Sequence, residues 1–385
     1  MTASRLRPQA PPLGPGPAAP LPVLLVVDSL DGGNAERYVV DLAIALHRRG
    51  WPVHVACSTD GVRAAALADA GVPVTVLLGE LGKRRVSGRY ARALHRLVAE
   101  LRPAVVHAHL FASAAAAVQA VRDLPVPLVV TEHIEAPWRD RRDRRDRRDR
   151  AVSGVVYRQA DHVVAVSTAI RDLLVADHGV APERVEVLLP TTAAPVPSGG
   201  PLPVTGGPVV GVVGRLVPEK GVDVFLRAAA LVSAVVPQAE FVVVGDGPLR
   251  PDLEHRVATL GLAGRVTFTG YRSEVSGLLP GLDVLAVPSR SDGSPLVVCE
   301  AMAAGVPVVA SRVGGLPDLV EDGGSGLLVR PGEAEDLARA LVALLLDPEA
   351  ARRLGARGCV LAATRSHERL VDRMTQLYAD VVRAR

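Results

Sequence analysis

Hydrophobic residues recur along the chain in two alternating patterns. Short β-branched runs such as PVLLVV at 22–27 are typical of buried strands, and longer segments with a spacing of three or four residues are typical of helices. In the first helical segment, four apolar residues from Val39 to Leu46 fall at i, i+3, i+4 and i+7, and Gly50 ends it. Further strands are predicted at 52–58, 73–78, 104–110, 127–133 and 162–167, and further helices at 61–71, 88–102, 112–124, 154–160 and 168–179.

This alternation stops at a stretch of Pro, Gly and Thr and then starts again. Strands are predicted at 209–214, 240–247, 265–270, 283–289 and 325–329, and helices at 221–236, 248–261, 274–282 and 334–347. Strands that alternate with helices predict parallel sheets covered on both faces. The expected fold class is α/β, with two Rossmann-like domains that face each other across a cleft at the carboxyl ends of their strands.

Five segments follow from the pattern. They are a disordered Pro-rich tail at 1–20, a first domain at 21–190, a linker at 191–208, a second domain at 209–365, and a C-terminal helix at 366–385 that can cross back to the first domain.

Composition narrows the class of protein. No apolar run reaches the 18 residues that suggest a membrane span, and the first twenty residues lack the apolar centre of a signal peptide. Three widely spaced cysteines argue for free thiols in a reducing compartment, so a cytoplasmic protein is expected. A net charge of +3 and an aromatic content of 3% argue against a nucleic-acid partner.

A run of eight Arg and four Asp at 139–150 interrupts the pattern. One interpretation is a solvated charged segment in which Arg and Asp pair with each other. The alternative is a peripheral contact with an anionic membrane surface, which would place the protein at the inner face of the membrane.

Candidate chemistry is concentrated in the second domain. The segment SDGSPLVVCEAMAAG at 291–305 predicts a helix with Ser294 as its N-cap, Asp292 just before it, and Glu300 as a lone acid among apolar residues. A buried carboxylate needs donors, which ribose hydroxyls, an arginine or backbone N–H groups would supply. Lysine occurs only twice in the chain, and Lys220 follows Arg215 on a turn after a strand, where two cations can neutralise a pyrophosphate.

The motifs GRLVPEKG, VVVGDGPLR, VTFTGYR and PSRSDGSPLVVCEAMAAG, with DGGNAER, VVHAHL and VVTEH in the first domain, resemble the retaining family 4 glycosyltransferases, which have the GT-B fold. The resemblance covers roughly residues 22–345. It implies that a sugar moves from a nucleoside diphosphate to an acceptor with retention at the anomeric carbon, without a metal and without a cofactor.

The resemblance also implies roles for individual residues. Arg215 and Lys220 would hold the donor diphosphate and stabilise it as it leaves. Glu300 would bind the ribose, Asp292 would orient the sugar, and Gly293 and Ser294 would offer backbone N–H groups. In the first domain Gly33 would approach the phosphate, His133 would lie near the transferred sugar, and His109 would line the acceptor side or belong to the core. Gly247 and Arg272 are expected near the base.

One position departs from the family pattern, because the first acid of the family's pair is usually Glu and this chain has Asp292. The expected donor is a UDP-sugar or GDP-mannose and the expected acceptor a glycan or a lipid-linked sugar. Two alternatives stay open: an epimerase of the same fold that acts on UDP-N-acetylglucosamine, and a nucleotide-sugar-binding protein without catalysis.

Overall fold

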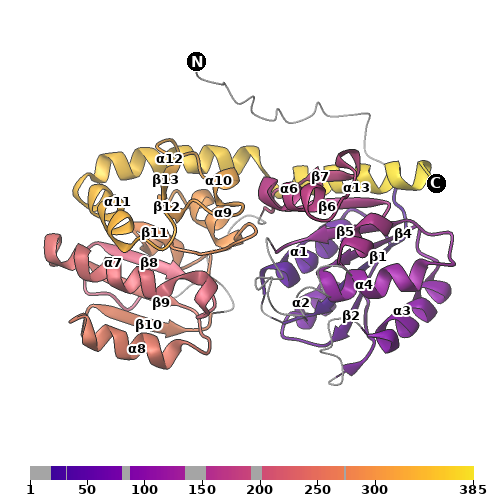
Figure 1. Ribbon diagram of the computed structural model, residues 1–385, viewed down its shortest axis with the longest axis horizontal. Helices are drawn as coiled ribbons and strands as arrows, with labels where there is room; N and C mark the ends of the chain where they lie inside the picture. Colours follow the sequence, from indigo (N-terminus) through magenta and orange to yellow (C-terminus); the bar gives the residue numbers. More distant parts are fainter. Residues whose placement is uncertain (1–18, 32, 80–86, 135–152, 192–201, 273–274) are drawn as a thin grey trace, which may run out of the picture.

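The computed structural model describes residues 19–31, 33–79, 87–134, 153–191, 202–272 and 275–385. The Arg/Asp run at 139–150, almost all of the Pro-rich start and most of the predicted linker lie outside these residues. Two lobes lie side by side in Figure 1, and each has a central sheet with helices on both faces. The predicted pair of Rossmann-like α/β domains is therefore confirmed.

The first sheet has seven parallel strands in the order β3-β2-β1-β4-β5-β6-β7. Their bounds are β1 Val23–Ser29, β2 Val53–Thr59, β3 Val74–Val76, β4 Val105–His109, β5 Leu128–Glu132, β6 His162–Ala165 and β7 Val185–Val187. Both faces of the sheet are buried: Leu24 and Val26 of β1 belong to one core, and Val23 and Leu25 belong to the other. Alternate residues of a strand point to opposite faces, so a strand buried on both sides must be apolar throughout.

Two groups of helices cover these faces. One core is closed by α3 (Gly88–Leu101), α4 (Phe111–Val121) and α6 (Thr168–Ala176). The other is closed by α1 (Asn34–Arg48), α2 (Ala64–Asp69) and α13 (His367–Arg383). Residues 153–159 are also helical, and a short 3-10 helix, η2 (Pro182–Arg184), precedes β7.

The second sheet is parallel as well, in the order β10-β9-β8-β11-β12-β13. Its strands are β8 Val209–Val213, β9 Glu240–Val244, β10 Val266–Gly270, β11 Val284–Val287, β12 Val308–Ser311 and β13 Gly326–Val329. One face packs on α7 (Val222–Val235), α8 (Arg250–Thr259) and α11 (Ala334–Leu346). The other packs on α9 (Leu296–Ala303) and α10 (Leu316–Leu319).

One predicted helix of this domain is wrong. The described part of this segment, 275–282, contains only the 3-10 helix η4 (Leu279–Gly281) after a turn at 276–278. Pro280 and the two glycines of the segment explain the difference, because proline removes a helix hydrogen bond and glycine is costly to order in a helix.

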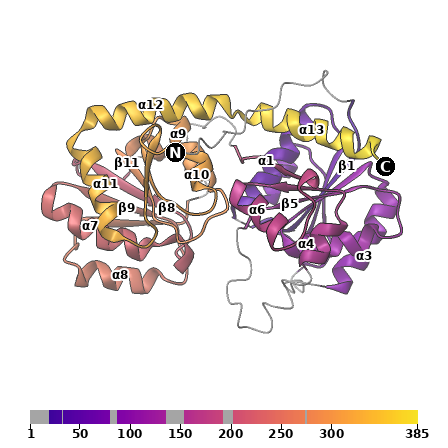
Figure 2. The same cartoon turned by 45° about the horizontal axis from the view of Figure 1, so that its top comes forward.

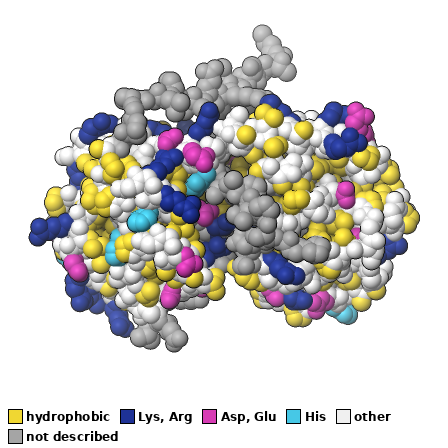
Figure 3. Space-filling view, turned by 180° about the vertical axis from the view of Figure 1, so that it is seen from behind, with side chains coloured by type: hydrophobic (Ala, Val, Ile, Leu, Met, Phe, Trp, Pro, Cys, Tyr) yellow, Lys and Arg dark blue, Asp and Glu magenta, His cyan; other side chains and the backbone are white. Residues whose placement is uncertain are grey.

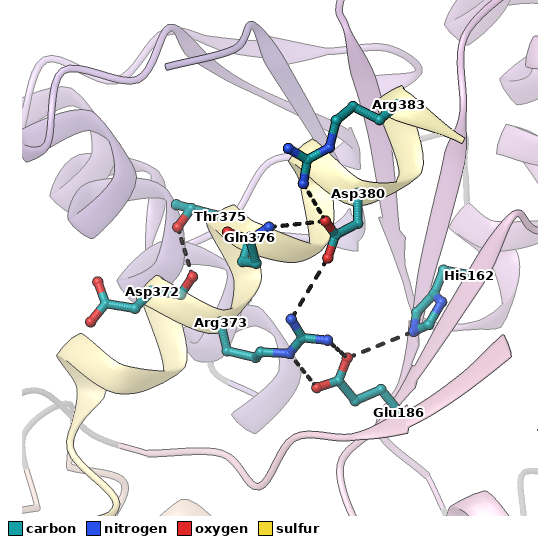
Figure 4. A network of polar contacts seen from close by, with 8 residues as sticks. All are labelled: His162, Glu186, Asp372, Arg373, Thr375, Gln376, Asp380 and Arg383. Atoms are coloured by element: carbon teal, nitrogen blue, oxygen red, sulfur yellow. Dashed lines mark hydrogen bonds and ion pairs between the residues drawn. The ribbon is translucent and has the colours of Figure 1, made fainter. Parts of the chain in front are cut away.

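The last two helices join the domains. α12 (Pro348–Thr364) packs on α9 in the second domain, and the chain then passes into α13, which lies along the first domain (Figures 1 and 2). Figure 4 shows how α13 is attached: Arg373 donates two hydrogen bonds to Glu186 of β7, at 2.6 and 2.8 Å. Deeper in the core, the hydroxyl of Tyr378 lies 2.6 Å from Nδ1 of His107. The chain that leaves the C-terminal end of the second domain is therefore anchored on the first domain.

In the described ranges, no helix is both long enough and apolar enough to cross a bilayer. In each sheet the strand order reverses beside the first strand of the domain, at β1 and β4 in the first and at β8 and β11 in the second. Loops that leave the carboxyl ends of such neighbouring strands diverge and form the usual ligand site of this kind of sheet.

Candidate active site between the two domains

Lys220 and Asp292 meet where the loops after β8 and β11 come together. Nζ of Lys220 lies 2.6 Å from Oδ2 of Asp292, and Ser289 donates to the same oxygen at 3.0 Å. Gly221 makes this approach possible, because a Cβ there would lie 2.0 Å from the carbonyl oxygen of Pro288. A carboxylate and an ammonium thus stand together at the strand-order reversal of the second sheet.

Arg215 also follows β8, but its side chain is exposed rather than part of this ion pair. The two predicted diphosphate-binding cations therefore occupy different positions. Lys220 is held in place by Asp292, whereas Arg215 stands at the surface of the same loop.

The start of α9 differs from the prediction. The N-cap position is Pro295, with an extended backbone, and no side-chain hydrogen bond caps the helix. Ser294 is therefore not the N-cap. Its residue is buried, and among the described residues its hydroxyl has no hydrogen-bond partner. Such an unsatisfied hydroxyl is unusual in a native protein and is suited to a ligand oxygen beside the positive end of a helix.

The two domains touch at Gly293. A Cβ on Gly293 would lie 2.0 Å from the carbonyl oxygen of His133, so only glycine fits between the loop after β11 and the end of β5. Asp318 of α10 accepts a hydrogen bond of 2.6 Å from the backbone N–H of Thr168, the first residue of α6. We call this facing surface of the two domains the seam. From behind, a notch separates the two lobes at the lower edge of the view, with charged side chains beside it (Figure 3).

Glu300 lies in the seam on α9. Its side chain is 4% exposed, and its Oε1 is 2.7 Å from NH1 of Arg37, a residue of α1 in the other domain. The lone acid of the apolar helix is thus paired with a cation that is 263 positions earlier in the sequence.

Histidines gather at the carboxyl ends of β4 and β5. Nδ1 of His109 lies 3.1 Å from Nε2 of His133, and the ring of Tyr38 packs edge-on against His133 with 5.2 Å between centroids. Burial lowers the pKa of His133 to about 3 and that of His109 well below its usual range, so both rings are neutral at pH 7. Leu110, which follows His109, has φ 68° and ψ 161°, a conformation rarely adopted outside glycine and frequent at functional sites.

The remaining candidate residues are spread over both domains. Gly33 is the N-cap residue of α1, and a Cβ there would collide with the carboxylate of Glu36. A Cβ on Gly247 would lie 2.6 Å from the carbonyl oxygen of Leu216, so packing of the loops after β8 and β9 is enough to require this glycine. Arg272 is exposed just beyond β10. Within the part of the chain that the structure describes, no hydrogen bond or ion pair joins Gly247 or Arg272 to the Lys220–Asp292 pair.

Two family models match the chain, one for each domain. Residues 32–190 match the model described as glycosyltransferase family 4, and residues 207–347 match glycosyl transferases group 1. A D-inositol 3-phosphate glycosyltransferase from Rhodococcus opacus is 31% identical over 388 residues, which cover 90% of this chain and 86% of that protein. The chain belongs to glycosyltransferase family 4.

Two further proteins are similar to the chain. A 2-deoxystreptamine glucosyltransferase from Streptomyces kanamyceticus is 38% identical over 247 residues, which cover 60% of this chain and 64% of that relative, less than two thirds of its length. The structure of Anabaena HepE in complex with UDP superposes with a TM-score of 0.80 at 24% identity, over 94% of this chain and all of that one. The family 4 chain described here thus has the GT-B fold.

Sequence reasoning gave no role to three residues near the site: Arg37 and Asp318 of the seam, and Tyr38 beside the buried histidines. Arg37 is the last residue of the DGGNAER motif, Tyr38 follows it, and Asp318 lies in the short helix α10. Their types are ordinary for helix surfaces, so no local signal marks them. Arg37 and Asp318 gain the partners described above only when one domain is placed against the other, whereas Tyr38 packs on histidines of its own domain.

Proposed function

We propose that the protein is a retaining glycosyltransferase that moves a sugar from a UDP-sugar or GDP-mannose to a glycan or lipid-linked acceptor without a metal ion. The observation that carries the proposal is the Lys220–Asp292 pair, which stands 2.6 Å apart at the strand-order reversal of the second sheet. Family membership and the GT-B fold support a nucleotide-sugar donor at this position.

In this proposal the donor diphosphate replaces Asp292 as the main partner of Lys220. Arg215 turns in from the same loop, and the unsatisfied hydroxyl of Ser294 and the start of α9 contact phosphate oxygens. As the bond from the anomeric carbon to the phosphate oxygen breaks, negative charge grows on the leaving group and these groups stabilise it. Fixed positive charges of this kind supply the neutralisation that a metal ion supplies in other enzymes.

The acceptor hydroxyl attacks from the same face that the diphosphate leaves. Its oxygen forms the new bond to the anomeric carbon, and its proton passes to an oxygen of the departing phosphate. Asp292 and neutral His133 act by positioning the sugar, because Ser289 still holds the carboxylate when Lys220 turns to the diphosphate and the imidazole is not protonated at pH 7. The shorter side chain at 292 is accommodated by these contacts, so aspartate in place of glutamate need not abolish turnover.

The decisive experiment incubates the protein with UDP-sugars and GDP-mannose and follows nucleotide release with and without acceptors. The acceptor panel includes inositol phosphate and 2-deoxystreptamine, since the names of two relatives contain them. Release that requires an acceptor supports transfer, an epimer formed without acceptor supports the epimerase alternative, and binding without turnover supports a protein without catalysis. The anomeric coupling in the product's NMR spectrum tests retention, and activity in the presence of EDTA tests metal independence.

A further inference from the structure

A buried acid that the proposed mechanism does not use holds the backbone of His133. Oε1 of Glu132, the last residue of β5, accepts hydrogen bonds of 2.9 Å from the backbone N–H groups of His133 and Ile134. Tyr157 donates its hydroxyl to the other carboxyl oxygen, Oε2. Glu132 is 3% exposed and Tyr157 is 1% exposed, so water hardly competes for these contacts. The backbone N–H of His133 is thus fixed on one side, and its carbonyl oxygen faces Gly293 on the other.

A second buried residue holds the ring of the same histidine. Nδ1 of His109 lies 3.1 Å from Nε2 of His133, and His109 is fully buried. Both rings are neutral at pH 7 because burial lowers the pKa of each, so one ring donates its N–H and the other accepts it. This contact uses Nε2 of His133 and leaves Nδ1 as the ring nitrogen that can meet a ligand. His133 is only partly buried, as a residue that meets a ligand must be.

His109 is itself supported by a neighbouring ring that is held at both nitrogens. The ring centroids of His107 and His109 lie 4.1 Å apart. Nδ1 of His107 lies 2.6 Å from the hydroxyl oxygen of Tyr378, and its Nε2 lies 2.7 Å from Oγ1 of Thr131. Rotation of the His107 ring would leave buried polar groups unsatisfied, which is costly. The support for His133 therefore extends from the core under α13 to the site.

We propose that Glu132 and His109 are positioning residues for sugar transfer: Glu132 fixes the backbone of His133, and His109 fixes the orientation of its ring. This inference rests on the proposed function, because His133 positions the transferred sugar only in that reaction. A ring held in advance does not have to be ordered when the donor binds, and a misplacement of about 1 Å can cost about 100-fold in rate. The proposed diphosphate contacts lie on loops of the second domain, so loosening His133 should lower kcat and leave the KM of the donor almost unchanged.

The first test asks whether Glu132 acts through its hydrogen bonds or through its charge. Burial raises the pKa of this carboxyl group, so an uncharged amide is a close substitute. In Glu132→Gln the amide oxygen accepts both backbone N–H groups and the amide N–H donates to Tyr157, so kcat should stay close to wild type. Glu132→Met has a side chain of similar length without these contacts, and its kcat should fall at least about tenfold with the KM of the donor unchanged.

Tyr157→Phe is a milder second variant for the same test, because it releases only Oε2 of the carboxyl group. Its kcat should fall in the same direction as that of Glu132→Met. Equal losses in Glu132→Gln and Glu132→Met would show that the charge or the proton of Glu132 matters, and an unchanged kcat in both Glu132→Met and Tyr157→Phe would show that its contacts do not. Either result overturns the positioning role of Glu132.

The second test follows the ring of His133 directly and needs no substrate. In protein with isotope-labelled histidines, the NMR shifts of the ring nitrogens distinguish the two neutral tautomers, and the signals absent from His133→Gln belong to His133. The wild type should show a single tautomer of His133 at pH 7. His109→Leu removes the partner of Nε2 and should give a mixture of tautomers and a lower kcat, whereas His109→Asn should restore most of both, because its amide lies near the position of Nδ1.

His95→Leu is the matched control for the histidine variants. Nδ1 of His95 also has one partner, the carbonyl oxygen of Ala120 at 2.8 Å, but His95 lies on α3 and not on a loop that carries a candidate residue. This variant should keep the wild-type kcat and the single tautomer of His133.

The outcomes separate this inference from the proposed function. Two tautomers in the wild type, or a single tautomer in His109→Leu, would overturn the role of His109 whether or not the protein transfers a sugar. A wild-type kcat in His109→Leu would overturn it as well. If the wild type releases no nucleotide from any donor with any acceptor, the proposed function fails and the positioning task of His133 fails with it, even where the spectra show a fixed ring.

Discussion

Replacing Gly293 by alanine tests whether the observed seam is the working arrangement of the two domains. The new Cβ would lie 2.0 Å from the carbonyl oxygen of His133, whereas Cβ contacts below 3.0 Å essentially never occur. The atom in the way belongs to the backbone at the end of β5 and cannot rotate aside. The two loops must therefore separate by at least about 1 Å.

The size of the effect follows from where this separation occurs. Gly293 lies next to Asp292, and His133 is the candidate residue beside the transferred sugar, so the shift falls between the two halves of the site. A misplacement of about 1 Å between reacting groups can cost about 100-fold in rate, or roughly 2.7 kcal/mol of activation free energy. Each domain keeps its own cores, so the melting temperature should change little.

The assay compares turnover, nucleotide affinity and thermal unfolding of Gly293→Ala with those of wild type. Gly88→Ala is the matched control, since a Cβ there would have its nearest neighbour, the guanidinium of Arg92, at an ordinary 3.8 Å. We expect turnover to fall about 100-fold in Gly293→Ala and to stay unchanged in Gly88→Ala. If Gly293→Ala keeps at least half of the wild-type turnover, the contact between Gly293 and His133 is not part of the active arrangement, and the domains work further apart.

Three further predictions concern the ion pair and the buried histidines. Lys220→Ala should lower kcat by more than about tenfold, because a charge-assisted contact to the leaving group contributes about 1.5–3 kcal/mol, and unchanged turnover would remove Lys220 from the site. Tyr378→Phe should destabilise the protein by about 1–3 kcal/mol in urea unfolding, since Nδ1 of buried His107 loses its partner, and an unchanged midpoint would contradict that role for the bond. Burial lowers the pKa of His107 to about 3, below the value of about 6.5 that is expected in the unfolded chain. With respect to this group, the protein therefore has its full stability above about pH 6.5 and loses stability as the pH falls from there towards 3. Unfolding free energies at pH 7 and pH 4.5 should differ by about 2–3 kcal/mol because of His107, and a flat profile would show that His107 titrates in the fold as it does in the unfolded chain.

The sequence was enough to determine the class of fold. Parallel strands buried on both faces must be continuously apolar, and the helices between them must have an apolar stripe. The alternation of strands and helices can therefore be predicted from the sequence alone. The two-domain division is equally visible, because the Pro- and Gly-rich stretch near 191–208 interrupts the periodicity. The sequence was less informative where helical spacing competes with local chemistry, as at 274–282, where Pro280 and two glycines prevent a regular helix.

The candidate site was predictable in part for a related reason. Four candidate residues lie after strand ends: Arg215, Lys220, Asp292 and Glu300. The topology of the second sheet brings these strand ends together, whatever the orientation of the two domains. Burial of Glu300 could also be foreseen, since its neighbours on α9 are apolar. The N-cap at Ser294 could not be settled in advance, because serine and the proline after it compete for the start of the helix, and backbone geometry decides in favour of Pro295.

Only the tertiary structure decided which residue of one domain contacts Glu300 and Gly293 of the other across the seam. That a buried Glu300 needs a partner follows from solvation energetics and can be inferred from the sequence. The cation that pairs with it is Arg37, 263 positions away and of the same residue type as Arg48 of α1. In the same way, the chain alone does not show that Gly293 must lack a side chain because a carbonyl of the other domain is there. Contacts between domains depend on how two separately folded surfaces are oriented, and no local periodicity records that orientation.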